Sequence, residues 1–586
     1  MLFSFLADRR KTTYRIYFFL LVVFILGFVG LVAKTGCSHQ SDMAWDMMLM
    51  LDGAYRLQYG QMPHVDYVSP FGIFPIWLVS LGMKIGGLNA NALAYGGALG
   101  LVFFTLLAWF IAARRLSGFF AFSLSLLVGC LFVASRPLSF GLLYYFFEFS
   151  HASYAMWYNR VGWALLSILA IQAFLLPNVK EESRLVSDME AFLAGCLVSL
   201  LALTKVNYLA AALGIIVVGF CVTQPGRRRI FWSLAGIACL PALLLTLTHF
   251  SARAWIDDIL IMGRLTDPHM RSVRLGQLVL GNLSDVLLVG AVLLLFKPFC
   301  GGLNGAWKEG GFGRLAIICG ACVSIGLVVL NLNMQVHEVP LFAVACAVIL
   351  ETALRAWTKG AVNKSGTELF RLWFAVGTGI YLFLVAGTML NDAASVVYSW
   401  AVKNHMKYSV PASGILQSKS LGPELMPPKQ GEPVEKENVL RDIAARRDFS
   451  LYMVGRVSFT PFQYAHLLND GLALLKPHTT PESRVFCMDL VNPFPFALLL
   501  QYPKKEPVWW VYNDRIFPKA EVMFGDVTHV MRPKFGLDNN SGMIKEVYHA
   551  YLLENFDHVS ASVLWDLYVR KSAPSSMRRS QILDSF

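Results

Sequence analysis

The chain has 586 residues, of which 56% are hydrophobic and only 15% are charged, more apolar surface than one soluble core can bury. The formal net charge of +12 would suggest a nucleic-acid partner in a soluble protein. Here much of the basic excess lies in short loops between apolar runs, where it sets membrane orientation. The composition therefore indicates a polytopic membrane protein and argues against nucleic-acid binding.

The N-terminal stretch predicts a retained first span. Residues 16–33 are apolar and approach the ~20 residues that a spanning helix needs. Residues 34–37, Lys-Thr-Gly-Cys, make a poor cleavage site for a signal peptide. The basic residues ahead of the run place the N-terminus in the cytoplasm; they are Arg9, Arg10, Lys11 and Arg15.

The apolar run at residues 71–85 is short and is interrupted by Pro75 and several glycines. A crossing there would place Arg114 and Arg115 outside, against the positive-inside tendency. We therefore predict that this segment lies in or dips into the outer interface. The remaining runs predict about eleven spans and an outer C-terminus; they are residues 16–33, 92–113, 119–134, 161–176, 189–222 (a tight hairpin of two spans), 230–247, 276–296, 315–330, 339–354 and 372–390.

This topology predicts a membrane module at residues 1–390 with outer loops at 34–75, 136–160 and 250–275. The hairpin has basic residues at both flanks, so its tip at residues 204–208 lies on the outer side. Lys205 is thereby delivered to membrane depth, where a lone lysine is rare without a partner.

Residues 391–586 predict a soluble α/β domain on the outer face. The segment 419–438 is rich in proline and charge, as in a linker or a long exposed loop. Helical periodicity follows at 437–449, 464–476 and 543–556, and short strands are predicted at 483–490, 527–533 and 561–570. Alternating strands and helices over this length favour one small α/β unit.

Four acids lie together in the first outer loop, at the membrane rim. Acids near hydrocarbon are costly unless they are paired, hydrated or used. In a helix, Asp42 and Asp46 share one face, and Asp52 shares another with Arg56. Structural roles compete with catalysis: Asp42 as a helix cap, Asp52 with Arg56 as an ion pair, and Asp66 as a turn former.

The loop pattern resembles the membrane glycosyltransferases of the GT-C superfamily, which include the protein O-mannosyltransferases and the lipid A aminoarabinose transferases. The likeness rests on an acid after the first span (Ser41-Asp42), an amphipathic helix and a Gly-x-x-Pro-x-x-Asp-Tyr turn from Gly60 to Tyr67. It extends through YAMWYNRVGWALL at 154–166, the LTKVNY tip at 203–208 and the outer C-terminal domain.

The resemblance implies a GT-C fold in the bacterial inner membrane, with the C-terminal domain in the periplasm. It implies a polyprenyl-phosphate-linked sugar as donor, a lipid, glycan or protein as acceptor, and catalysis on the outer face. The family's first-loop acid acts as a base or orients the acceptor, and Asp42 matches it best. Because Met43 follows instead of a second acid, Asp46 and Asp66 remain rivals for this role.

The chemistry of sugar transfer names further candidates. A transition state with oxocarbenium character needs one carboxylate to take the acceptor proton and cations to stabilise the leaving phosphate. Lys205, Arg160 and the third-loop residue Arg264 are candidate phosphate ligands, with headgroup contact as the alternative for both arginines. Substrate-orienting candidates are Tyr158, Asn159, His337 and Glu338, the last two alternatively capping the following helix.

No cofactor is predicted to be obligatory. A divalent cation can bind acids and His64, but no spacing is diagnostic of a metal site. The sequence does not decide whether Cys37 and Cys487 pair. Rival functions are an O-antigen type polymerase or ligase, a lipid or sugar transporter, and a non-catalytic receptor; no inverted repeat of the transporter kind is seen.

Overall fold

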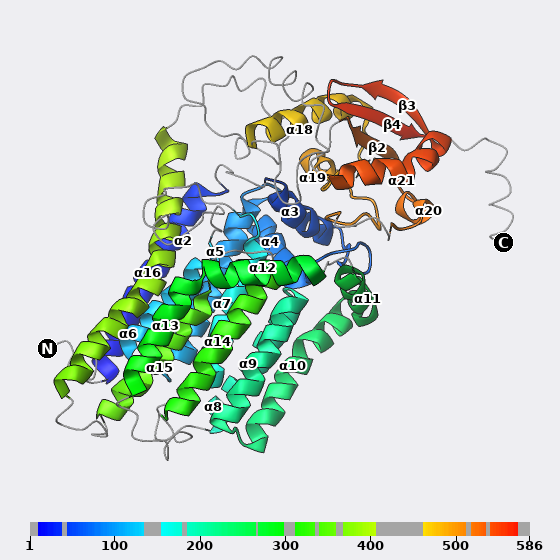
Figure 1. Ribbon diagram of the computed structural model, residues 1–586. Coiled ribbons are helices and arrows are strands. Elements are labelled where there is room, and N and C mark those ends of the chain that lie inside the picture. The colour runs from blue at the N-terminus through cyan, green and yellow to red at the C-terminus, as the bar shows by residue number, and fades with distance from the viewer. Residues whose placement is uncertain are drawn as a thin grey trace.

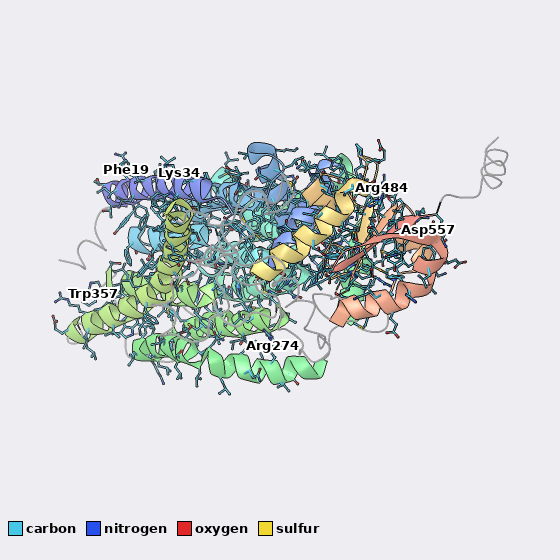
Figure 2. The ribbon with its side chains drawn as sticks, turned by 90° about the horizontal axis from the view of Figure 1, so that it is seen from above. Phe19, Lys34, Arg274, Trp357, Arg484 and Asp557 are labelled. Carbon is cyan, nitrogen blue, oxygen red and sulfur yellow. The ribbon has the colours of Figure 1, made fainter. Side chains whose placement is uncertain are left out.

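The computed structural model describes residues 10–37, 44–133, 154–177, 184–264, 268–297, 311–333, 339–358, 367–405, 461–510, 517–534 and 539–571. It has a long helical bundle with a smaller sheet-containing region at one end (Figure 1). Viewed from above, that region, marked by Arg484 and Asp557, lies towards one side of the bundle, away from Phe19 and Lys34 (Figure 2).

The bundle confirms the predicted polytopic helical fold: ten of the eleven predicted spans are each formed by one helix among the described residues, and the run at 276–296 is divided between α12 and α13. The bundle helices are α2 (Arg10–Thr35), α5 (Ala92–Ala112), α6 (Gly118–Cys130), α7 (Trp157–Phe174), α8 (Arg184–Ala202), α9 (Val206–Thr223), α10 (Arg227–Leu247), α12 (Pro268–Gly281), α13 (Leu283–Phe296), α14 (Phe312–Leu332), α15 (Pro340–Thr358) and α16 (Thr367–His405).

Eight helices among the described residues are long and apolar enough to cross a membrane, and a ninth span results if α12 and α13, bent by 61°, count as one. The helix α6, with 13 residues, is too short to be counted among these, and α7, with 18 residues, is not apolar enough. Large apolar side chains on α10, such as Phe231 and Leu234, are more than half exposed. Such a surface suits contact with lipid, whereas α15 is almost wholly buried in the centre of the bundle.

The predicted hairpin at 189–222 is formed by α8 and α9. It turns at residues 203–205, so Thr204 and Lys205 lie in the turn as predicted, whereas residues 206–208 of the predicted tip form the start of α9. The helix α8 also touches α10 backbone to backbone: a Cβ on Gly195 would lie 2.0 Å from the Ser233 carbonyl oxygen. Small residues at such crossings allow helices to pack without a hydrophobic driving force in lipid.

The short segment 71–85 forms α4 (Ile73–Gly86), which runs antiparallel along α5. Its Phe74 ring packs edge-on against Phe104 with centroids 5.8 Å apart, and at its other end Gly82 meets the Ala92 backbone. A helix of 14 residues is about 21 Å long, shorter than the ~30 Å hydrocarbon core. The helix is therefore too short to cross the core by itself, and its predicted place at the outer interface stays a prediction.

The C-terminal region holds a four-stranded sheet in the order β1-β2-β4-β3. Strand β1 pairs with β2 in parallel, and β4 pairs antiparallel with both β2 and β3. Predicted strands became β1 (Val485–Cys487), β2 (His529–Pro533) and β4 (Trp565–Arg570), while β3 (Phe556–Ala561) was missed. The helical segments are α18 (Pro461–Leu475), η8 (Lys476–His478), α19 (Phe494–Leu498), α20 (Ala520–Met523) and α21 (Asn539–Asn555).

Two helices lie near the junction of bundle and sheet region: α3 (Ala44–Gln58) and α11 (Ala252–Arg264). In Figure 1, α3 lies between the bundle and the sheet region, and α12 runs across the same end of the bundle. The helix α16 continues to His405, beyond the boundary predicted at residue 390. The predicted linker at 419–438 and helix at 437–449 fall outside the described residues.

Candidate active site

Helix α3 carries the first-loop acids into the junction between bundle and sheet region. Its sequence, AWDMMLMLDGAYRLQ, favours a helix because Ala, Met and Leu dominate and no β-branched residue interrupts it. Residues 45–56 are all buried. The Trp45 ring lies edge-on to Tyr464 of α18, and Tyr55 does the same with Phe496 of α19. The C-terminal region thus covers the face of α3 that the bundle leaves open.

Asp46 is the buried acid nearest the start of this helix. It is 4% exposed, and its Oδ2 atom has no hydrogen-bond partner among the described residues. Burial raises the pKa of the Asp46 carboxyl to about 7, although a hydrogen bond from the Met156 backbone and the charge of Lys205 oppose this shift. Asp46 is therefore poised to exchange a proton near neutral pH.

Lys205 reaches the same place from the tip between α8 and α9. The tip is fixed by two backbone hydrogen bonds, from the Gly72 N–H to the Thr204 carbonyl (3.0 Å) and from the Phe74 N–H to the Leu203 carbonyl (2.9 Å). Burial lowers the pKa of the Lys205 ammonium to about 8, and the charge of Asp46 partly offsets this shift. A lysine held in this way is a cation that a phosphate can pair with.

Tyr158 completes the group. The Lys205 Nζ lies 5.3 Å from the centroid of the Tyr158 ring. The Phe71 ring stacks on the Tyr158 ring, with the two centroids 4.9 Å apart. Asp46, Lys205 and Tyr158 form what we call the acid–lysine site. The three residues come from three separate segments, and the sequence named each of them as a candidate.

Asn159 and Arg160 directly follow Tyr158 in the first turn of α7 and are buried in the bundle. The Arg160 guanidinium pairs with Asp392 of α16 at 2.5 Å, and both side chains are at most 2% exposed. The Asn159 side chain is fully buried, and neither its amide nitrogen nor its oxygen has a hydrogen-bond partner among the described residues. Its backbone carbonyl accepts a hydrogen bond from the Tyr208 hydroxyl (2.6 Å), which links α7 to α9.

Asp66 shapes a turn. Its carboxylate accepts a hydrogen bond from the Met62 N–H (2.8 Å) and lies 3.1 Å from Nε2 of the exposed His249. Its backbone carbonyl accepts a hydrogen bond from the Lys505 N–H (2.6 Å), so the turn is tied to the C-terminal region. These contacts are those of the turn-forming alternative for Asp66.

Two buried polar contacts escaped the sequence analysis. Arg56 pairs with Asp52, as expected, but its Nη2 also lies 3.6 Å from Oε2 of the fully buried Glu506. In the same turn as Asp66, His64 Nδ1 lies 2.8 Å from Oδ2 of Asp258 on α11. Both partners are distant along the chain, and no local pattern points to them.

No family model matches the sequence, and no curated protein does. The fold is similar to that of ArnT from Cupriavidus metallidurans. The structure of that protein bound to undecaprenyl phosphate is 11% identical, with a TM-score of 0.42 over 94% of this chain and 98% of that chain. Its apo structure is 12% identical, with a TM-score of 0.39 over 94% and 99%.

ArnT is one of the enzyme types that the sequence motifs resemble, the lipid A aminoarabinose transferases. Identities and TM-scores this low assign neither a reaction nor site residues to this chain. The function is therefore argued below from the side chains.

Several sequence candidates lie outside the described residues, namely Asp42, His337 and Glu338. For Arg264, the last residue of α11, only the backbone is described. Cys37 and Cys487 are both buried, and neither forms a disulfide, so they do not pair with each other. The Cys37 Sγ instead lies 3.1 Å from Sδ of Met47 on α3.

Proposed function

We propose that the protein is a membrane glycosyltransferase that transfers a sugar from a polyprenyl-phosphate-linked donor to a hydroxyl group of a lipid, glycan or protein acceptor. The observation that carries this proposal is the acid–lysine site. A buried carboxylate with a pKa near 7 lies near a half-buried lysine, at the end of the bundle covered by the C-terminal region.

The two charged groups match the two demands of the reaction. The acceptor hydroxyl must lose its proton as it attacks the anomeric carbon, and the deprotonated Asp46 accepts that proton. The bond from the anomeric carbon to the phosphate oxygen breaks, and the leaving polyprenyl phosphate gains negative charge, which Lys205 stabilises. No step of this scheme requires a metal ion.

The position of Lys205 suits a lipid-linked donor. It lies at the tip of a membrane hairpin, so a phosphate bound there keeps its prenyl chain among the apolar helices. The rings of Tyr158 and Phe71 form an apolar wall beside Lys205. The positive-inside tendency places this end on the outer, periplasmic side of the inner membrane.

Replacement of Asp46 by Asn tests the proposal. Loss of a general base lowers rates by about 10²–10⁴-fold, so we expect transfer to fall by at least about 100-fold. The product is measured by mass spectrometry in cells that contain equal amounts of each variant. Asp257→Asn is the matched control, because this acid is 61% exposed on α11.

Full transfer by Asp46→Asn at normal protein level would contradict the assignment. The variants Asp42→Asn and Asp66→Asn, tested in parallel, decide between the three acids. The masses also separate a transferase from a polymerase or ligase: single additions of one sugar support the proposal, and the addition of long chains contradicts it.

A further inference from the structure

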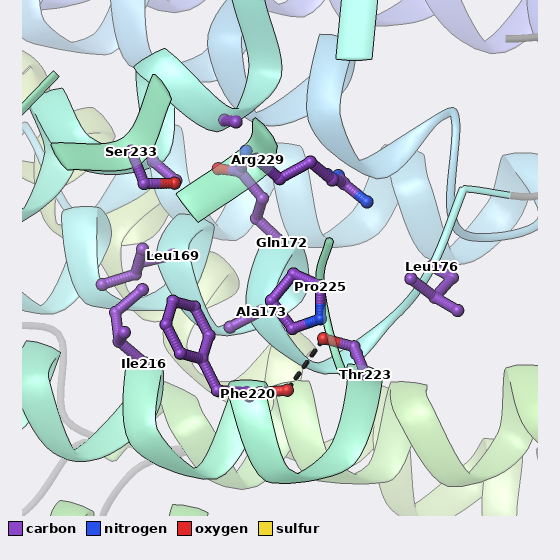
Figure 3. A pocket seen from close by; sticks show the side chains of 13 residues that line it. Leu169, Gln172, Ala173, Leu176, Ile216, Phe220, Thr223, Pro225, Arg229 and Ser233 are labelled. Atoms are coloured by element: carbon purple, nitrogen blue, oxygen red, sulfur yellow. Dashed lines mark hydrogen bonds between the residues drawn. The ribbon is translucent and has the colours of Figure 1, made fainter. Parts of the chain in front are cut away.

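A cavity of about 60 Å³ lies between α7, α8, α9 and α10, at the end of the bundle opposite Lys205. Its apolar wall includes Leu169, Ile216 and Phe220, and its polar residues include Gln172, Arg229 and Ser233. In Figure 3 the polar ends of these three residues lie on one side of the pocket and Phe220 on the other. The cavity is far from the acid–lysine site and has no part in the proposed transfer.

Gln172 is the buried polar group of this cavity. The side chain is 8% exposed, and its Nε2 donates a hydrogen bond to the Glu190 carbonyl (2.5 Å). Its Oε1 accepts no hydrogen bond from any residue that the structure describes. A buried carbonyl oxygen in this state is costly unless a donor from outside the chain supplies the bond.

Arginines gather near Gln172. The Glu190 carboxylate forms a bidentate ion pair with Arg115 (2.6 and 3.0 Å) and a second pair with Arg114 (2.6 Å). The Arg229 Nη2 lies 3.9 Å from the same carboxylate. Among the described residues, three guanidinium groups thus surround the one buried acid Glu190. The neighbouring Arg228 pairs with a different acid, Asp188.

We propose that this cavity binds the headgroup of an anionic glycerophospholipid. The lipid phosphate pairs with Arg229, and a headgroup hydroxyl donates a hydrogen bond to Oε1 of Gln172. The cavity has room for a group of a few heavy atoms, which fits a glycerol headgroup and not an acyl chain. The acyl chains run outward along Phe220, which is 37% exposed at the rim.

Charge selects among lipids. The three arginines beside Glu190 attract an anionic headgroup such as phosphatidylglycerol and repel the ammonium group of phosphatidylethanolamine. The site lies at the arginine-rich end, which the positive-inside tendency assigns to the cytoplasmic leaflet, where basic pockets between helices recognise such headgroups.

The test uses the full-length protein, delipidated in detergent, and native mass spectrometry with short-chain phosphatidylglycerol, short-chain phosphatidylethanolamine and glycerol 3-phosphate. We expect phosphatidylglycerol to bind and to raise the unfolding temperature. Phosphatidylethanolamine and the chain-free phosphate should each bind at least about tenfold more weakly. Equal binding of the two lipids would overturn the proposal, and equal binding of glycerol 3-phosphate would reassign the site to a free phosphate ester.

Variants locate the site. Arg229→Gln and Gln172→Leu should each weaken phosphatidylglycerol binding by about tenfold, since each removes one contact to the headgroup. Ser233→Leu fills the cavity from its rim without touching the Gln172 bond to Glu190, and it should abolish binding even if Gln172→Leu folds poorly. Arg228→Gln is the matched control and should bind within about twofold of the parent. Unchanged binding by Arg229→Gln and Ser233→Leu would overturn the proposal.

Discussion

Burial moves the pKa values of Asp46 and Lys205 towards each other, to about 7 and about 8 respectively. The base must be deprotonated, so activity should rise as the pH passes through about 7. The lysine must be protonated to hold the phosphate, so activity should fall as the pH passes through about 8. We expect a bell-shaped dependence of kcat/KM on pH with a narrow maximum between these values, measured with purified protein in detergent.

The variant Lys205→Arg tests whether Lys205 causes the alkaline limb of this pH profile. An arginine keeps its charge across this range, so the alkaline limb should move to higher pH while the acid limb stays. An alkaline limb unchanged in Lys205→Arg would show that another group causes it. The fall of activity would then say nothing about Lys205.

The sequence could name these residues because their signals are local. Asp46 lies in a cluster of acids next to an apolar run, and Lys205 interrupts a hairpin that is otherwise apolar. Glu506, the second acidic partner of Arg56, carries no such local signal. Glu506 lies in the C-terminal region, and only the fold brings it within 3.6 Å of that guanidinium. In the same way, only the fold brings His64 and Asp258 into contact.

At the scale of elements, the contact of α4 with the hairpin tip sets the position of Lys205. A Cβ on Gly72 would lie 2.1 Å from the Leu203 carbonyl oxygen, too close for any side chain. Gly72→Ala should therefore displace the tip that presents Lys205. We expect a lower unfolding temperature and at least about a tenfold loss of transfer, since small displacements of a catalytic group are costly.

Gly379→Ala in α16 is the control for this substitution. Among the described residues, no atom outside its own helix backbone and chain neighbours lies within 4 Å of the Cβ it would add. The substitution should therefore leave activity unchanged and, as alanine favours helix, not reduce stability. If Gly72→Ala behaves in the same way as Gly379→Ala, the tip is not held by this contact.

The sequence predicts bundle helices better than it predicts an edge strand. Long apolar runs identify bundle helices because a backbone in lipid must satisfy its own hydrogen bonds. All the predicted spans are accordingly helical, although the run at 276–296 breaks into α12 and α13. Strand β3 was missed because it lies at the edge of the sheet and exposes Asp557, His558 and Val559. Its strand state comes from pairing with β4 across the sheet and not from its own pattern.

At the scale of the whole molecule, Arg56 joins the bundle side to the C-terminal region. Its guanidinium lies over the rings of Tyr67 and Tyr502, at 4.7 and 4.2 Å from their centroids, and donates a hydrogen bond to the Pro503 carbonyl (2.8 Å). Asp52 and Glu506 supply the negative charge around it. One buried cation thus holds α3 and the segment around Glu506 together.

Arg56→Met should therefore weaken the docking of the C-terminal region. Removing one partner of a buried ion pair typically costs ~3–5 kcal/mol, because the remaining charge stays buried without compensation. Hydrogen–deuterium exchange of the α3 backbone amides reports the free energy of local opening and should show a loss of this size. If the loss arises from the stranded Glu506 carboxylate, the double variant Arg56→Met/Glu506→Gln should recover part of it, since a neutral amide is less costly to bury. Equal exchange in the parent and in Arg56→Met would show that the apolar contacts of α3, such as Tyr55 with Phe496, hold the junction without the ion pair.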